Sequence, residues 1–158
     1  MRMQLLLVAL AACPLAACTS GEAAEAQQQQ DAAVVEALPL PPGFYISDGE
    51  SCGSASNATL ILLHKSGINS SREPCEFSRI EQVAPSAFQV TQSCSDNGEA
   101  WGRETTIYEV VSQVKVTGEQ SFRLTYDSDS EPVDWQYCPQ SSLPDPWRDT
   151  DISDLIGG

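Results

Sequence analysis

The chain has 158 residues, of which 22 are Asp or Glu and only 8 are Lys or Arg, so its formal net charge at pH 7 is −14. This length predicts a single domain. Nucleic-acid binding needs a basic surface, so the charge balance excludes that class of function. The same balance disfavours a basic contact with anionic lipid headgroups.

The first residues have the pattern of an export signal. Arg2 provides a short positive region, and an apolar run follows over residues 5–12. This run is too short to span a membrane. Small residues then lead to a cysteine, as at the end of a secretory signal. We therefore expect residues 1–17 to be a signal peptide.

The stretch Leu15-Ala16-Ala17-Cys18 resembles the lipobox of bacterial lipoproteins. The resemblance implies that the Cys18 thiol receives a diacylglyceryl group, that the signal is cut before Cys18, and that the new amine takes a further acyl chain such as palmitate. The non-acidic Thr19 that follows implies transport to the outer membrane, where the protein faces the periplasm. The lipid bilayer is then a partner through acylated Cys18.

Two alternatives to this lipidation site remain open. Leu10-Ala11-Ala12-Cys13 fits the same pattern, although cutting there leaves a very short signal and Pro14 follows directly. Ordinary signal cleavage with free secretion is the other alternative. Lipidation at Cys18 is the interpretation that the signal's length favours.

Residues 18–42 have the composition of a tether. They are rich in Ala, Gln, Glu and Pro and contain a run of Gln over 27–30. Low-complexity segments of this kind do not build a core. The prolines at its end, Pro39, Pro41 and Pro42, predict that the folded domain begins at Gly43.

Residues 43–139 carry the alternating pattern of β-strands, with no convincing helix. Close spacing of short strands predicts an all-β fold, a small antiparallel β-barrel or sandwich of about seven or eight strands in meander order. The run TLILLHK over 59–65 is continuously apolar, which is typical of a strand buried on both faces or at a barrel seam. Residues 140–158 are predicted to form an acidic C-terminal tail, on which Trp147 and a turn near Ile152 are candidates to dock. The expected strands are 44–46, 59–65, 75–83, 87–94, 105–111, 114–116, 122–126 and 133–138.

Residues 75–83 and 87–94 predict the clearest hairpin. A register in which Cys75 lies opposite Cys94 puts Phe77 on the same face as Val90 and leaves mostly polar side chains on the other face. Ile80 is the exception, because this register places it on the polar face.

The exported domain keeps an even number of cysteines, which predicts two disulfides in an oxidising compartment. The hairpin register favours Cys75–Cys94 and leaves Cys52–Cys138. The pairing Cys52–Cys75 with Cys94–Cys138 remains the main alternative. The spacings contain no CxxC pair, so we expect no metal site.

Little in the chain predicts catalysis, and we expect no enzyme activity and no cofactor. His64 is the one histidine, and no GxSxG motif accompanies it. The acidic turn 127–131 begins like a calcium loop, but Pro132 stands where such a loop needs its Gly, and Cys138 replaces the bidentate Glu. Trp135 and Tyr137 are expected in the core.

Two main classes of function remain. The first is a non-catalytic binding module in the periplasm, and the acidic stretch 127–154 makes a cationic envelope protein its possible partner. The second is an inhibitor of a basic cell-wall hydrolase, because small lipid-anchored β-barrel inhibitors of lysozyme are similar in plan. Residues 53–56 and 65–67 would then enter the enzyme's cleft. A carrier of lipid or another small ligand is a third alternative, with Leu60 to Leu63 lining its cavity.

Overall fold

The computed structural model describes residues 32–157 except 71–72, 97, 99–101 and 127–128. Nine antiparallel strands form one sheet with the order β1-β5-β6-β7-β8-β9-β2-β3-β4. The helical elements of the described ranges are short: η1 (Cys52–Ser54), η3 (Gln140–Ser142), η4 (Trp147–Asp149) and α1 (Ser153–Ile156). The strands are β1 (Ala33–Val34), β2 (Gly43–Ser47), β3 (Leu60–His64), β4 (Gly67–Ser70), β5 (Cys75–Ala84), β6 (Ala87–Ser95), β7 (Ile107–Gly118), β8 (Ser121–Thr125) and β9 (Val133–Cys138).

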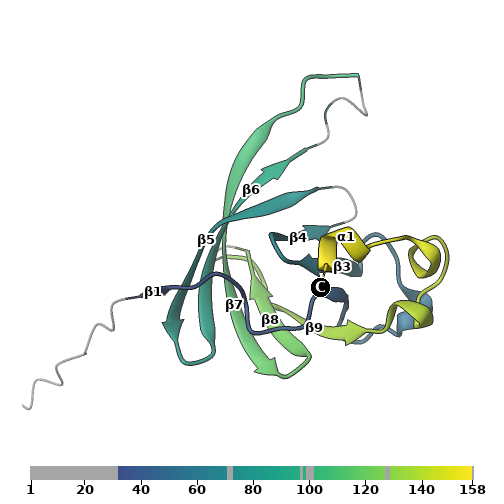
Figure 1. Cartoon of the computed structure of the whole chain (residues 1–158), viewed down its shortest axis with the longest axis horizontal. Helices are drawn as coiled ribbons and strands as arrows, with labels where there is room; N and C mark the ends of the chain where they lie inside the picture. The colour runs from purple at the N-terminus through teal and green to yellow at the C-terminus, as the bar shows by residue number, and fades with distance from the viewer. Residues whose placement is uncertain (1–31, 71–72, 97, 99–101, 127–128, 158) are drawn as a thin grey trace, which may run out of the picture.

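The sheet is a meander that curls back toward its own beginning (Figure 1). Strands β5 to β9 follow one another, β9 pairs with β2, and β2 to β4 complete the order. Among the described residues no ladder joins β4 to β5, so the sheet does not close. Side chains bridge this seam instead. The Cys75 amide donates to Asn69 Oδ1 at 2.7 Å, and the Ile68 amide donates to Gln92 Oε1 at 2.9 Å.

The all-β, antiparallel prediction is confirmed, with one difference in strand count. The predicted strands over 105–111 and 114–116 are a single strand, β7. Strands β1 and β4 were not predicted, and each is very short. The prediction named a barrel or a sandwich. The structure has a single curled sheet that stops short of closing into a barrel.

A β-bulge at Ser78 corrects the predicted hairpin register. Cys75 pairs with Cys94 as expected, but beyond Phe77 the register shifts by one residue. Ile80 therefore pairs with Val90, and the two side chains are 3% and 0% exposed. A one-residue slip exchanges the faces of a strand. The bulge thus moves Ile80 from the polar face into the core.

The main core lies inside the curl. Tyr45, Phe122 and Trp135 are buried there, and the Tyr45 and Phe122 rings meet edge to face with centroids 5.1 Å apart. Leu38 and Leu40 belong to the same cluster. The core therefore includes residues of the predicted tether, and the folded part begins before Gly43, because β1 pairs with β5.

A second hydrophobic cluster covers the outer face of β2 and β3. Leu143 and Ile152, from the predicted acidic tail, pack there with Phe44 and Leu60. Strand β3 consequently has buried residues on both faces, with Ile61 and Leu63 in the main core. This arrangement explains the continuous apolar run that the sequence shows at this strand.

The two disulfides are Cys52–Cys138 and Cys75–Cys94, which confirms the favoured pairing. Cys75–Cys94 joins directly opposite residues of β5 and β6. Cys52–Cys138 joins η1 to the end of β9 and spans 86 residues of sequence. It therefore fixes the long connection between β2 and β3 to the end of β9, the strand that pairs with β2.

Candidate functional site

An apolar groove of about 250 Å³ lies between the outer face of β3 and β4 and the C-terminal segment 139–157. In Figure 1 this segment, in yellow, lies beside these two strands. Strands β2 and β3 supply the floor, with Phe44, Leu60 and Leu62, because alternate residues of β3 face outward. Trp147, Ile152 and Leu155 supply the opposite wall.

The groove is an incompletely covered part of the second hydrophobic cluster. Leu155 is 43% exposed, while Leu62 and Trp147 are half-buried. A cavity of ~150 Å³ accommodates a benzene ring. This groove is larger, so it has room for a large apolar side chain of another molecule.

The C-terminal segment that forms one wall of the groove is acidic. Segment 139–157 has four Asp and one Arg, a net charge of −3. Arg148 is already paired with Asp145 at 2.6 Å and lies 3.6 Å from Asp149. Asp151 lines the groove, and its carboxylate accepts a hydrogen bond from the Ser153 amide at 3.0 Å.

The hydrogen bonds from Ser153 lower the pKa of Asp151 below its ordinary value. Asp151 is therefore ionised at neutral pH. An exposed apolar patch with a polar rim is typical of an interaction site. Negative charge beside an apolar surface favours association with positively charged groups.

The two loops of the inhibitor hypothesis lie at opposite ends of β3. Residues 53–56 belong to the connection that precedes β3, and 65–67 form the turn that follows it. Five strand residues between them correspond to ~16 Å. The two loops are therefore not adjacent parts of one surface.

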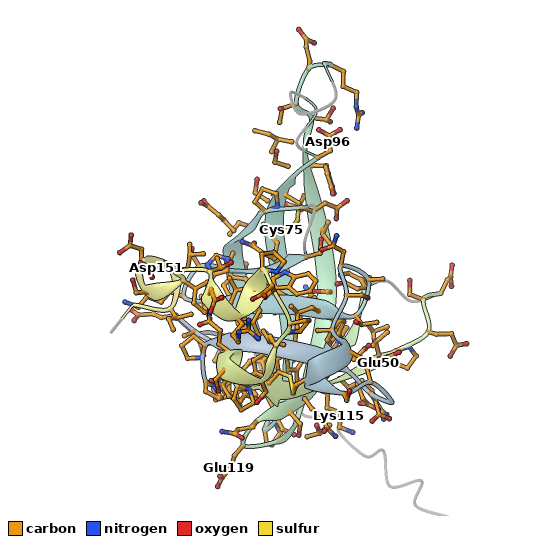
Figure 2. The ribbon with its side chains drawn as sticks, turned by 90° about the vertical axis from the view of Figure 1, so that its right-hand side faces the viewer. Glu50, Cys75, Asp96, Lys115, Glu119 and Asp151 are labelled. Atoms are coloured by element: carbon orange, nitrogen blue, oxygen red, sulfur yellow. A yellow bond between two sulfur atoms is a disulfide. The ribbon has the colours of Figure 1, made fainter. Side chains whose placement is uncertain are left out.

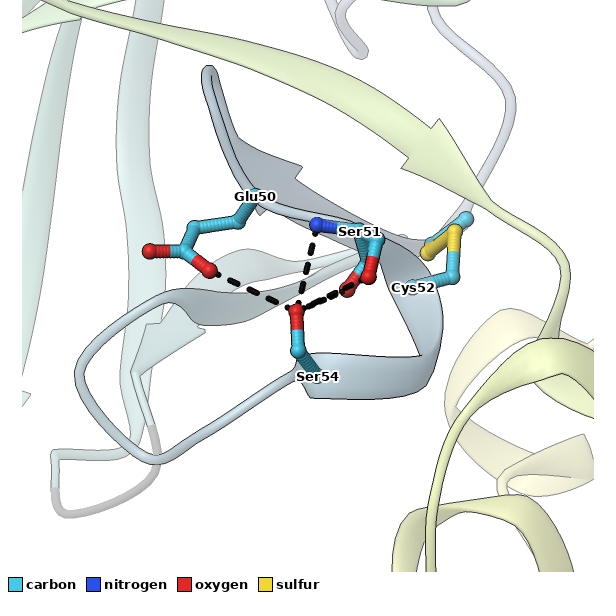
Figure 3. The surroundings of a disulfide bond; sticks show 5 residues. Glu50, Ser51, Cys52 and Ser54 are labelled. Carbon is cyan, nitrogen blue, oxygen red and sulfur yellow. Dashed lines mark hydrogen bonds between the residues drawn. A yellow bond between two sulfur atoms is a disulfide. The ribbon is translucent and has the colours of Figure 1, made fainter.

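Local bonds hold each of these loops. Figure 3 shows Ser54 Oγ at the centre of a network with Glu50 and Ser51, next to the disulfide of Cys52. In the other loop the Ser66 carbonyl accepts the Phe77 amide, which ties the turn to β5. Loop 65–67 is thus part of the seam between β4 and β5.

The remaining sequence candidates have different positions. His64 is 6% exposed, with Nδ1 3.3 Å from Ser66 Oγ and no hydrogen-bond partner at Nε2. Trp135 and Tyr137 are in or against the main core, as expected.

Cys18 and the first two residues of turn 127–131 lie outside the described residues. In the described part of the chain, no three His, Cys, Asp or Glu side chains gather into a possible metal site.

Sequence reasoning missed the groove because its two walls are far apart in the chain. The only local signal is the apolar run of β3, which needs a cover on its outer face. Which segment covers it depends on the packing of Leu143 and Ile152.

Comparisons of the chain with protein-family models, with curated proteins and with solved structures found no match. None of the helices in the described ranges is long and apolar enough to cross a membrane.

Proposed function

We propose that this protein is a lipid-anchored envelope lipoprotein whose β domain is a non-catalytic binding module. The groove between β3, β4 and the C-terminal segment is its binding surface, and the partner is a basic envelope protein that inserts an apolar side chain. The observation that carries this proposal is the combination of an unfilled apolar floor and an acidic rim. Apolar burial would supply affinity, and the rim would supply selectivity and a faster association.

The proposed anchor is acylated Cys18. From Cys18 to Ala33, the first residue of β1, the chain has 15 residues. A flexible segment of that length has a root-mean-square reach of ~21 Å. The domain would therefore stay close to the outer-membrane surface on the periplasmic side, with the start of β1 nearest the anchor.

The separation of loops 53–56 and 65–67 argues against their joint insertion into a single hydrolase cleft. A hydrolase inhibitor would have to use one loop alone or the groove itself. Titration of a muramidase with the protein tests this alternative function separately from the capture experiment below.

The test is affinity capture of the tagged, full-length protein from lightly cross-linked native membranes, read by mass spectrometry. Leu155→Gln removes an apolar wall of the groove. Its matched control is Val111→Gln on the outer face of β7, because Val111 is 44% exposed, as Leu155 is at 43%. Asp151→Asn removes the charge at the rim, with Glu119→Gln as control. Figure 2 shows Asp151 and Glu119 at widely separated places on the surface.

We expect one basic protein near one-to-one stoichiometry with the unchanged chain and with both controls. Leu155→Gln should reduce its recovery about tenfold, which corresponds to ~1.4 kcal/mol. Asp151→Asn should reduce recovery mainly at low salt, because exposed charges are screened at high salt. Equal recovery with Leu155→Gln and Val111→Gln would contradict the groove as the binding surface.

A further inference from the structure

The interior of the curled sheet changes from apolar to polar along its length. The inward residues of β7 are Val114, Ser112, Val110 and Tyr108 in that order toward the β6–β7 loop, and their partners on β6 include Val90 and Gln92. Ser112 is 1% exposed and its hydroxyl has no hydrogen-bond partner. A core built only for packing would place apolar side chains at these positions. The polarity therefore points to a role for this end of the interior.

A cavity of about 90 Å³ lies at this polar end, one residue pair beyond Ser112. It is next to the seam between β4 and β5, where side chains replace the ladder. Gln92, Tyr108, Tyr126 and Glu73 line it together with the disulfide Cys75–Cys94. None of the described lining residues is Lys or Arg.

Glu73 lines the same cavity as Tyr108 and Tyr126. Partial burial and the charge of Glu73 raise the pKa of Tyr108 and of Tyr126 above the ordinary tyrosine value. Both phenols are therefore neutral at physiological pH. Two neutral aromatic rings beside a carboxylate form a set of groups that attracts a cation.

We propose that this cavity binds a small organic ammonium group, with Tyr108 and Tyr126 as the aromatic wall and Glu73 as the counter-charge. The enclosed volume is smaller than the ~150 Å³ that accommodates benzene, but Glu73 is exposed and Tyr126 is 40% exposed, so an ammonium head can enter in part and rest against the Tyr126 ring. Aromatic rings bind quaternary ammonium through the attraction between the cation and the ring quadrupole. The net charge of −14 also raises the local concentration of cations.

This site is distinct from the groove of the proposed function, which lies on the outer face of β3. Binding here can therefore be tested separately. The probe is choline, titrated calorimetrically into the full-length protein in an uncharged maltoside detergent. The matched neutral probe is dimethylbutanol, in which carbon replaces the quaternary nitrogen.

Three variants probe the lining. Tyr126→Leu removes a ring, Tyr126→Phe keeps it, and Glu73→Gln removes the charge. Glu73 is exposed and Tyr126 is 40% exposed, so these changes leave the main core intact. Glu109→Gln, on the exposed outer face of β7, is the charge control.

We expect choline to bind at least tenfold more tightly than dimethylbutanol. Tyr126→Leu and Glu73→Gln should each weaken choline binding about tenfold, while Tyr126→Phe and Glu109→Gln should change it less than twofold. Equal affinity for the two probes would overturn the proposal, as would choline binding that Tyr126→Leu leaves unchanged. No heat of binding with the unchanged chain would overturn it as well.

Discussion

Gly67 packs directly against the backbone carbonyl of Cys75, and a Cβ at Gly67 would overlap that oxygen. The contact lies at the seam between β4 and β5, where the sheet lacks a ladder. Glycine at this position is what allows the two backbones to approach. The seam therefore depends on the absence of a side chain at one residue.

Gly67→Ala should destabilise the protein by about 1–3 kcal/mol, because the added methyl group meets backbone that cannot easily move. Gly53→Ala is the control, since a Cβ there meets no atom within 4 Å. Urea unfolding followed by circular dichroism measures both free energies. Equal urea midpoints for the two variants would show that the backbone at the seam can move to accept the methyl group without loss of stability.

The two disulfides should differ in their contribution to stability. Cys52–Cys138 closes 86 residues and Cys75–Cys94 closes 19. Loop-closure entropy of the unfolded chain then gives ~4.6 and ~3.2 kcal/mol, respectively. The double variant Cys52→Ala/Cys138→Ala should therefore have the lower urea midpoint of the two double variants. The reverse order would mean that the unfolded chain retains structure between β2 and β9.

The bulge at Ser78 predicts the effect of shortening Ile80. Ile80→Ala should cost about 2–5 kcal/mol, as expected for a buried isoleucine that leaves a cavity. Val83→Ala, where the side chain is 39% exposed, should cost less than ~1 kcal/mol. Denaturant unfolding of the two variants distinguishes the observed register from the unbroken one. Similar losses would place Ile80 outside the core.

Alternation along the chain was enough to predict most of the sheet, including the Cys75–Cys94 pair. The bulge was not predicted, because one extra residue changes the face on which the later side chains lie without changing their alternation. Its only trace in the sequence is that Ile80 falls on the polar face of the unbroken register. Strand β4 was not predicted for a different reason: it has only four residues, and a side chain from another strand holds it in place.

The candidate sites were harder to predict than the strands. The groove exists because Ile152 and Leu143 return to the outer face of β3. The sequence indicates a docked turn near Ile152, but no local pattern specifies the face on which it docks. The polar cavity depends on inward-facing Gln92 and Tyr108. Their alternation is visible in the sequence, but their position at the open seam is not.

The contacts of the Asp96 carboxylate predict that the stability of the β6–β7 loop depends on pH. Its carboxylate accepts hydrogen bonds from the amides of Thr106 at 2.9 Å and Gly98 at 3.0 Å, and it lies 3.1 Å from Arg103. The Thr106 hydrogen bond is the largest cause of its lowered pKa, followed among the lowering causes by the Gly98 hydrogen bond and the positive charge of Arg103. A lowered pKa means that this stabilisation is complete above the ordinary aspartate pKa of ~3.9 and is lost as the pH falls through the folded-state pKa.

The amide shifts of Gly98 and Thr106 should therefore titrate together with a midpoint below ~3.9. Two-dimensional NMR from neutral pH downward measures that midpoint. Asp96→Asn should abolish the titration of both amides, and Glu109→Gln should leave it intact. A midpoint at or above the ordinary aspartate value would contradict the arrangement.

The lipid anchor predicts how the protein partitions in cells. Cys18→Ala should move the protein from the membrane fraction to the soluble periplasmic fraction, because two or three acyl chains anchor stably and no other anchor is proposed. Cys13→Ala should leave it in the membrane, since Cys13 belongs to the proposed signal peptide. Fractionation with intact mass measurement of the mature protein separates the alternatives. A mature chain that begins at Cys18 with added acyl mass supports the anchor, whereas a wild-type chain without acyl mass, together with a Cys18→Ala variant that stays membrane-bound, would contradict it.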